Sequence, residues 1–105
     1  FFKFRQLAKY SGCLFSSSKG QTGQEAFGQY AAVSMPAMEA AGGRFLHVAP
    51  VAGVFVGPAE DWDMVAIGHY PDLAAFYALY ENKAYQAAYG HRVAACERQK
   101  VLVSG

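Results

Sequence analysis

The stretch that most constrains the fold is residues 42–77, GGRFLHVAPVAGVFVGPAEDWDMVAIGHYPDLAAFY, which predicts two strands, a short polar turn and a helix. Because successive side chains point to opposite faces of a strand, residues 45–56 place apolar side chains on both faces. A sheet that is apolar on both faces needs a cover on each. We therefore expect helices on one face and a further layer on the other.

The chain before this stretch predicts one strand and one helix. Residues 1–8 alternate apolar and charged side chains, as a strand with one wetter side does. Thr22 and Glu25 match a capping box, so a helix is expected to start there. Pro36 removes a helical hydrogen bond and predicts a bend, and the glycine pair 42–43 predicts the end of the helix.

The hairpin strands are predicted at residues 44–56 and 62–70, with a tight turn at 57–61. Pro50 cannot donate a hydrogen bond in a ladder, and so indicates an edge strand or a bulge. The helical pattern that follows starts at residues 71–72, where a proline suits the first turn and an aspartate suits the positive end of the helix dipole.

A weak break at 81–83 separates that helix from another at 84–98, and residues 100–103 predict the last strand. The order is strand, helix, strand, strand, helical region, strand. This is the βαββαβ order of a ferredoxin-like α+β sandwich with a four-stranded antiparallel sheet.

The apolar content is high for a soluble domain of this length. Of 105 residues, 53% are apolar and 16% are charged. The length suits a single domain over residues 1–105. Helices cover only one sheet face, and an uncovered apolar face larger than about 400 Å² is unusual on a monomer. We therefore expect a homodimer that pairs through the helix-free sheet face.

Charge and targeting signals exclude several classes of partner. The net charge is +1 and there is no long basic run, so nucleic-acid binding is not expected. The first residues lack the pattern of a signal peptide, and no apolar run approaches the ~20 residues of a membrane helix. We expect a soluble, cytoplasmic protein without membrane contact. The chain does not begin with Met, so we also expect residues before Phe1.

The two cysteines do not predict a disulfide. Cys13 and Cys96 occur in unrelated contexts without a CxxC motif, so both are expected to be reduced thiols. Cys13 lies in the Ser/Gly-rich stretch 10–21, which predicts a mobile connection. The apolar triplet 13–15 within it either fixes this loop to the core or forms a lid over a pocket.

A series of short motifs follows in order along residues 22–105. They are a Pro-containing helix, Gly42-Gly43-Arg44-Phe45-Leu46, a strand ending in Gly57, Trp62-Asp63, His69-Tyr70-Pro71-Asp72, Tyr85-Gln86-Ala87-Ala88, Arg92 and Val101-Leu102-Val103. The series resembles the dimeric α+β barrel superfamily and, within it, an uncharacterised family of small bacterial proteins. The resemblance implies two sheets packed face to face in an eight-stranded barrel, with a ligand site in the crevice between sheet and helices. It does not imply one activity, because relatives include oxygenases, lyases and haem-degrading enzymes.

The histidines predict no metal site. In a regular register, His47 and His69 share a sheet face, but no carboxylate lies at ligand spacing from them. Haem-degrading and quinone-forming relatives use an Asn on the first strand, a Trp and a helical His. Trp62 and His91 resemble the last two, whereas the first strand offers Gln6 and no Asn.

Arg92 is the charge expected to be buried, because it shares a helical stripe with Tyr85 and Tyr89. A buried arginine needs a partner. One interpretation is a structural pair with a carboxylate such as Asp63 or Glu97. The other is capture of an acidic small molecule.

Our leading hypothesis is a small-ligand-binding barrel with an acidic or aromatic ligand in the crevice. The expected contacts are His69, Tyr77, Tyr89 and Arg92, with Trp62 and His47 at the edge. One alternative is a cofactor-independent monooxygenase-like enzyme acting on an aromatic or polyketide-like substrate, and another is a structural dimer without a site. The sequence has no phosphate-binding loop, nucleophile elbow or HExxH motif, and neither a cofactor nor a metal is expected.

Overall fold

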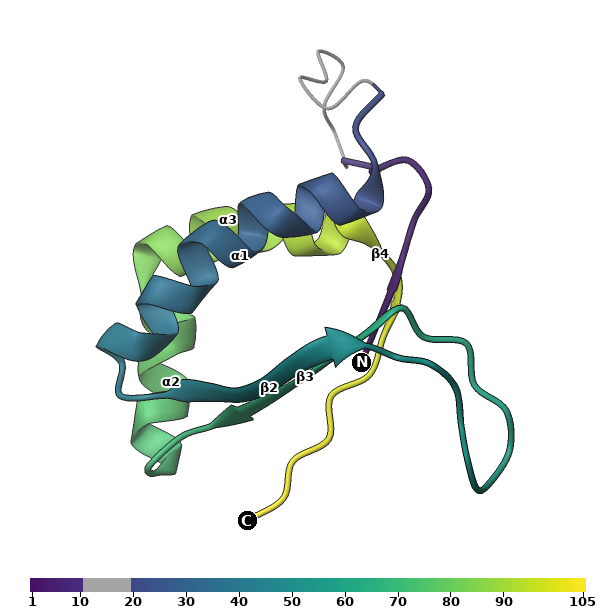
Figure 1. The fold of residues 1–105 in the computed structure, drawn as a ribbon. Coiled ribbons are helices and arrows are strands. Elements are labelled where there is room, and N and C mark those ends of the chain that lie inside the picture. Colours follow the sequence, from purple (N-terminus) through teal and green to yellow (C-terminus); the bar gives the residue numbers. More distant parts are fainter. Residues whose placement is uncertain (11–19) are drawn as a thin grey trace.

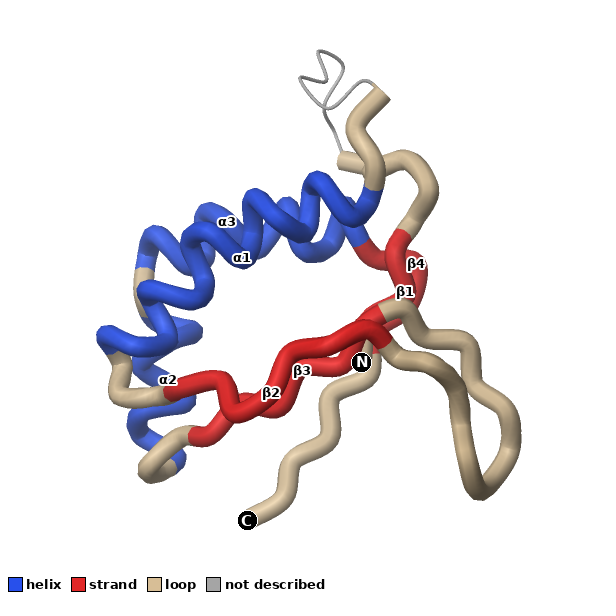
Figure 2. Tube along the Cα trace, viewed as in Figure 1, coloured by secondary structure: helices blue, strands red, loops and turns tan. Residues whose placement is uncertain are grey.

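The computed structural model describes residues 1–10 and 20–105. Most of the predicted 10–21 loop, including Cys13 and the triplet 13–15, lies outside the described residues. The helices and strands are β1 (Phe2–Phe4), α1 (Gly23–Ala40), β2 (Arg44–Pro50), β3 (Met64–His69), α2 (Leu73–Glu81), α3 (Lys83–Ala95) and β4 (Cys96–Gln99) (Figure 1, Figure 2).

The sheet has four antiparallel strands in the order β2-β3-β1-β4. This strand order, in a chain that combines helices with an antiparallel sheet, confirms the predicted ferredoxin-like α+β fold. The helices α1 and α3 lie side by side on one face of the sheet, and α2 lies at one end of the pair (Figure 1). The predicted break between the last two helices is confirmed at Asn82, which ends α2 and caps α3.

Local side-chain chemistry sets both ends of α1. The Thr22 hydroxyl accepts a hydrogen bond from the Glu25 amide, and the Glu25 carboxylate accepts one from the Thr22 amide, each at 3.0 Å. This is the predicted capping box. Gly42 follows the helix with a φ of +96°, a conformation that favours glycine. The helix continues through Pro36, and the bend expected there stays a prediction.

The predicted tight turn at 57–61 is wrong. The strand β2 ends at Pro50 and β3 begins at Met64, so residues 51–63 form a long projecting loop (Figure 1). The run 51–56 is apolar, but Phe55 is fully exposed at 101% and Val56 is 83% exposed. Pro50 has no amide to donate, and one further backbone hydrogen bond, from the Val51 amide to the Asp63 carbonyl at 3.1 Å, follows it. The positive φ values at two glycines of the loop then turn the chain away from the sheet.

The outer strands also differ from the prediction. The strand β1 covers only Phe2–Phe4 of the expected residues 1–8. The last strand is Cys96–Gln99, whereas the apolar residues 101–103 predicted for it lie beyond the sheet and are exposed. Pairing with β1 determines which residues form the last strand, because Phe4 pairs with Cys96 and Phe2 pairs with Gln99.

The register of β2 and β3 contains an irregularity at Leu46. Phe45 pairs with Gly68, but His47 pairs with Ile67, so one residue of β2 is extra. Paired residues share a face, and alternate residues of a strand share a face. His47 and His69 therefore lie on one face, as predicted.

That face points away from the helices. By the same alternation, its centre carries apolar side chains and its ends carry polar ones. The apolar residues are Ala49, Val65 and Ile67. His47 lies opposite Ile67, Arg44 and His69 lie at one end, and Lys3 and Arg98 lie on the β1/β4 side. The sheet is thus less uniformly apolar on this face than the sequence suggested.

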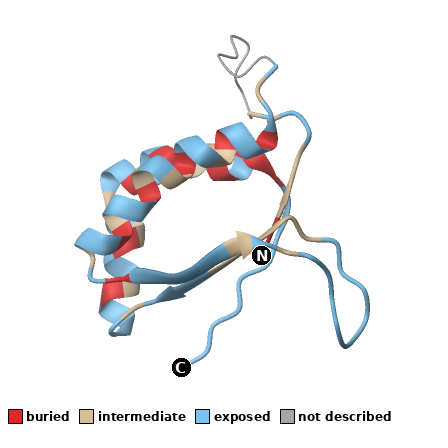
Figure 3. Cartoon of the chain, viewed as in Figure 1, coloured by how far each residue is buried: buried red, intermediate tan, exposed pale blue. Residues whose placement is uncertain are grey.

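The buried core lies partly between the helices and the β1/β4 half of the sheet and partly among the three helices (Figure 3). One cluster joins β1, α1 and the α3–β4 junction, and the other joins α1, α2 and α3. Their buried members are Phe2, Ala26, Ala95 and Cys96 in the first, and Tyr30, Met38, Leu79 and Tyr85 in the second. The strand β2 is exposed over most of its length (Figure 3).

At Gly23 the backbone of α1 lies very close to the backbone of neighbouring segments, and this contact yields the first testable prediction. A Cβ atom there would lie 2.6 Å from the carbonyl oxygen of Ala95 and closer still to that of Arg5. Because both obstacles are backbone, Gly23→Ala should lower the free energy of unfolding by about 3 kcal/mol or more in urea denaturation.

The matched control is Gly28→Ala in the same helix, where an added Cβ meets nothing within 4 Å. It should raise the free energy of unfolding by about 0.5 to 1 kcal/mol, because alanine is the better helix former. Equal stability of the two variants would contradict the close approach at Gly23.

Candidate functional site

Arg92 is the charged side chain buried in the crevice, and it projects from α3 toward α1 and the sheet. The Asn82 side chain accepts a hydrogen bond from the Tyr85 amide at 2.9 Å and so fixes the start of α3. Helical spacing then directs Tyr85, Tyr89 and Arg92 to one face, as predicted. Arg92 is only 6% exposed.

The Arg92 guanidinium contacts residues from four elements. Its Nε donates to the Oε1 atom of Gln99 at 2.6 Å, and its Nη1 donates to the Tyr30 hydroxyl at 3.3 Å. Its central carbon lies 5.2 Å from the ring centroid of Phe2, 5.6 Å from that of Tyr30 and 5.2 Å from that of Tyr89. Ring faces attract the cation most strongly where water is excluded.

The predicted carboxylate partner of Arg92 is wrong. Asp63 instead accepts hydrogen bonds from Lys3 and from the Phe4 amide. Glu97 is exposed on β4, whereas Cys96 and Gln99 pair with Phe4 and Phe2 and share their helix-facing side. Within residues 1–10 and 20–105, no carboxylate forms an ion pair with Arg92.

A tyrosine cluster extends the site along α3. The hydroxyls of Tyr30 and Tyr85 are hydrogen-bonded at 2.8 Å, and Tyr85 is 1% exposed. Burial, together with the bond to Tyr30, raises the pKa of Tyr85 above its usual range, so this phenol keeps its proton at neutral pH. Beside it, a cavity of about 400 Å³ is lined by Tyr80, Tyr85, Gln86 and Tyr89.

The other predicted contacts do not join Arg92. The Trp62 indole donates to Glu60 at 3.1 Å, and its ring lies under the Arg98 guanidinium at 4.9 Å. His47 and His69 are exposed on the helix-free sheet face. Tyr77 is 55% exposed on α2. Of the six predicted contacts, the structure brings together Tyr89 and Arg92.

Sequence reasoning missed the groups that complete the site. Phe2, Tyr30 and Gln99 belong to β1, α1 and β4, and each reaches Arg92 only through the tertiary fold. Tyr30 alone had a local signal, since it lies on the apolar stripe of α1. Gln99 had none, because it lies in a polar strand that the hydrophobic pattern did not predict.

The described residues offer little to a metal ion. No group of three or more His, Cys, Asp or Glu side chains gathers within residues 1–10 and 20–105. His91 bonds instead to the Tyr10 hydroxyl through Nδ1 at 2.5 Å. No helix in this part of the chain is long and apolar enough to cross a membrane.

Comparison with known proteins places these features in a family context. Residues 17–105 match the family described as Domain of unknown function (DUF1330). A crystal structure of RPA0582, a protein of unknown function from Rhodopseudomonas palustris, is similar, with a TM-score of 0.78 and 33% identity over 91% of this chain and 69% of that chain. The structure of methylated RPA0582 gives a TM-score of 0.76 and 32% identity over 91% of this chain and 68% of that chain. No curated protein matches at a significant level.

Cys96, which borders the site, yields a prediction about thiol reactivity. Burial raises the pKa of this thiol to about 11, so it remains protonated at pH 8. Since only the thiolate reacts, labelling of Cys96 by iodoacetamide in the folded protein should be at least about 100-fold slower than in urea. Mass spectrometry of the Cys96 peptide measures this rate separately from that of Cys13. Similar rates in the folded and unfolded protein would contradict the buried position.

Proposed function

This chain belongs to the DUF1330 family of domains of unknown function, and from that premise we propose that it binds a small anionic ligand in the crevice at Arg92. The observation that carries the proposal is a cation that is 6% exposed and pairs with no carboxylate of the described residues. Burying an unpaired charge costs several kcal/mol. An anionic ligand supplies the opposite charge and recovers part of this cost.

Gln99 is the group that the ligand replaces. Its carboxamide oxygen accepts the Nε hydrogen of Arg92, and Gln99 itself is exposed at the last position of β4. A carboxylate in the same position forms a bond roughly twice as strong as a neutral one. Rotation of an exposed side chain is rapid, so Gln99 can move aside for a ligand whose carboxylate replaces its hydrogen bond.

The tyrosines favour a flat ligand. Tyr80, Tyr85 and Tyr89 line an open hollow of about 400 Å³, and Tyr89 also contacts the Arg92 guanidinium. Aromatic rings pack well against other rings in tilted and offset arrangements. A planar aromatic carboxylate combines the charge for Arg92 with a surface for these rings.

Benzoate binding to Arg92→Met tests this proposal. Loss of the charge-assisted bond should weaken binding by about ten-fold or more, measured by NMR titration. The matched control is Arg98→Met, which removes an arginine that lies over Trp62 on the other side of the sheet. That variant should bind benzoate like the parent protein.

A second variant tests the same site if Arg92→Met folds poorly. Gln99→Glu places a carboxylate where the carboxamide accepts the Arg92 hydrogen bond. It should raise the midpoint of unfolding and block benzoate. If benzoate binds Gln99→Glu and the parent protein equally well, or binds neither, the site at Arg92 is excluded and a structural dimer without a site is favoured.

We also propose that the chain is a homodimer of the dimeric α+β barrel type, paired through the helix-free sheet face. Support comes from Ala49, Val65 and Ile67, which form an apolar centre with polar residues at both ends, the arrangement of a protein interface. Ile67 is 49% exposed in the single chain. A stable interface of this kind buries roughly 800 Å² per partner.

Light scattering coupled to gel filtration tests the dimer. Ile67→Glu places a charge at the centre of the proposed interface and should give a monomer at micromolar concentration, because a buried unpaired carboxylate is costly. The control Val93→Glu alters a residue of α3 that is 51% exposed, and should leave the dimer intact. A parent protein that is monomeric at this concentration would refute the dimer.

A further inference from the structure

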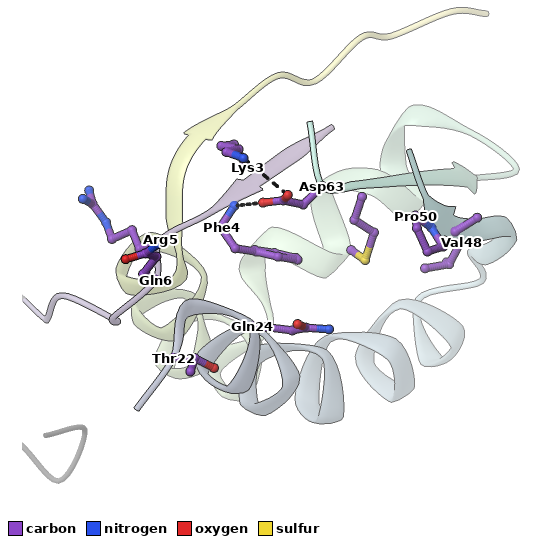
Figure 4. A pocket seen from close by; sticks show the side chains of 11 residues that line it. Lys3, Phe4, Arg5, Gln6, Thr22, Gln24, Val48, Pro50 and Asp63 are labelled. Atoms are coloured by element: carbon purple, nitrogen blue, oxygen red, sulfur yellow. Dashed lines mark hydrogen bonds and ion pairs between the residues drawn. The ribbon is translucent and has the colours of Figure 1, made fainter. Parts of the chain in front are cut away.

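A second, larger cavity lies at the opposite end of the α1–α3 pair from the tyrosine cavity. It has a volume of about 800 Å³ and opens between the start of α1, the strand β1 and the adjoining ends of β2 and β3 (Figure 4). Its lining residues are Lys3, Phe4, Arg5, Gln6, Thr22, Gln24, Val48, Ala49, Pro50, Asp63 and Met64.

The walls of this cavity are apolar because β2 extends beyond the cover of the helices. Val48 is 48% exposed although it lies on the helix side of the sheet. Pro50 and Met64 pair across the two strands and continue the same surface, and Phe4 closes it on the β1 side. A ligand with an apolar body would remove this surface from water, which favours binding.

Asp63 brings the negative charge to the cavity. Its Oδ2 atom accepts the Phe4 amide at 2.7 Å, whereas its Oδ1 atom accepts Lys3 at only 3.4 Å. Lys3 lies closer to Asp61, at 3.0 Å. An ionised carboxylate accepts about four hydrogen bonds, so Asp63 keeps unused acceptor capacity. Its side chain is 37% exposed, and Asp63 is one of the residues that line the cavity.

The surrounding groups favour a cation over an anion. Gln24 lies across the cavity from Asp63 and offers a carboxamide oxygen as a second acceptor (Figure 4). Arg5 lines the cavity, but its guanidinium points away from it (Figure 4). Lys3 pairs with both Asp61 and Asp63, so these three groups together carry one net negative charge.

We propose that this cavity is a binding site for an organic ammonium ion with an apolar chain. The ammonium group donates to the Asp63 Oδ1 atom, and the chain packs on Phe4, Val48 and Met64. The site is separate from the anion site at Arg92, because the two share no residue.

Hexylamine and hexanoate form a matched pair of probes with the same chain and opposite charge. Hexylamine should shift the backbone NMR signals of Gln24, Val48 and Met64 with saturation at millimolar concentration, and hexanoate should not. Asp63→Asn keeps the side-chain shape and removes the charge, so it should weaken hexylamine binding by about ten-fold or more. Asp61→Asn, which changes the other carboxylate on Lys3, should bind like the parent protein.

Two further variants make the outcome decisive. Val48→Trp fills the cavity without altering a charge, so it should abolish binding even where Asp63→Asn fails to fold. Arg92→Met should leave hexylamine binding unchanged, which separates this site from the proposed function. Equal binding of hexanoate, undiminished hexylamine binding to Asp63→Asn or Val48→Trp, or the absence of saturable binding to the parent protein would each overturn the proposal.

Discussion

The arrangement of the core depends on one buried cation. The Arg92 guanidinium contacts Phe2 of β1, Tyr30 of α1, Tyr89 of α3 and Gln99 of β4. An isolated buried charge would be very costly, but ring faces and hydrogen-bond acceptors replace much of its hydration. The first and last strands, the two long helices and the candidate site are therefore coupled through a single side chain. Stability and the proposed ligand affinity therefore rest on the same residue.

Local chemistry made much of the fold predictable. The capping box of Thr22 and Glu25, the left-handed Gly42 and the Asp72 cap act within a few residues, so their effects could be inferred from spacing alone. The order of the strands followed from the order of the elements. These signals were sufficient for the ferredoxin-like topology.

The errors came from non-local effects. Residues 101–103 have the apolar character of a strand, yet the polar segment Cys96–Gln99 forms β4 because it pairs with β1. The apolar run 51–56 likewise lies outside the sheet. At the site, Arg92 and Tyr89 could be found from helical spacing, whereas Gln99 and Tyr30 come from other elements. No short-range pattern specifies which residues of a distant strand will meet a helix.

The irregular register of β2 has a consequence for solubility. This strand is at the edge of the sheet, where a row of unsatisfied backbone groups can recruit another chain and start aggregation. The extra residue at Leu46 interrupts the regular spacing of that row, and Pro50 removes a donor at its end. Arg44 adds a charge at the other end. These features oppose the pairing of this apolar edge strand with the edge of another chain.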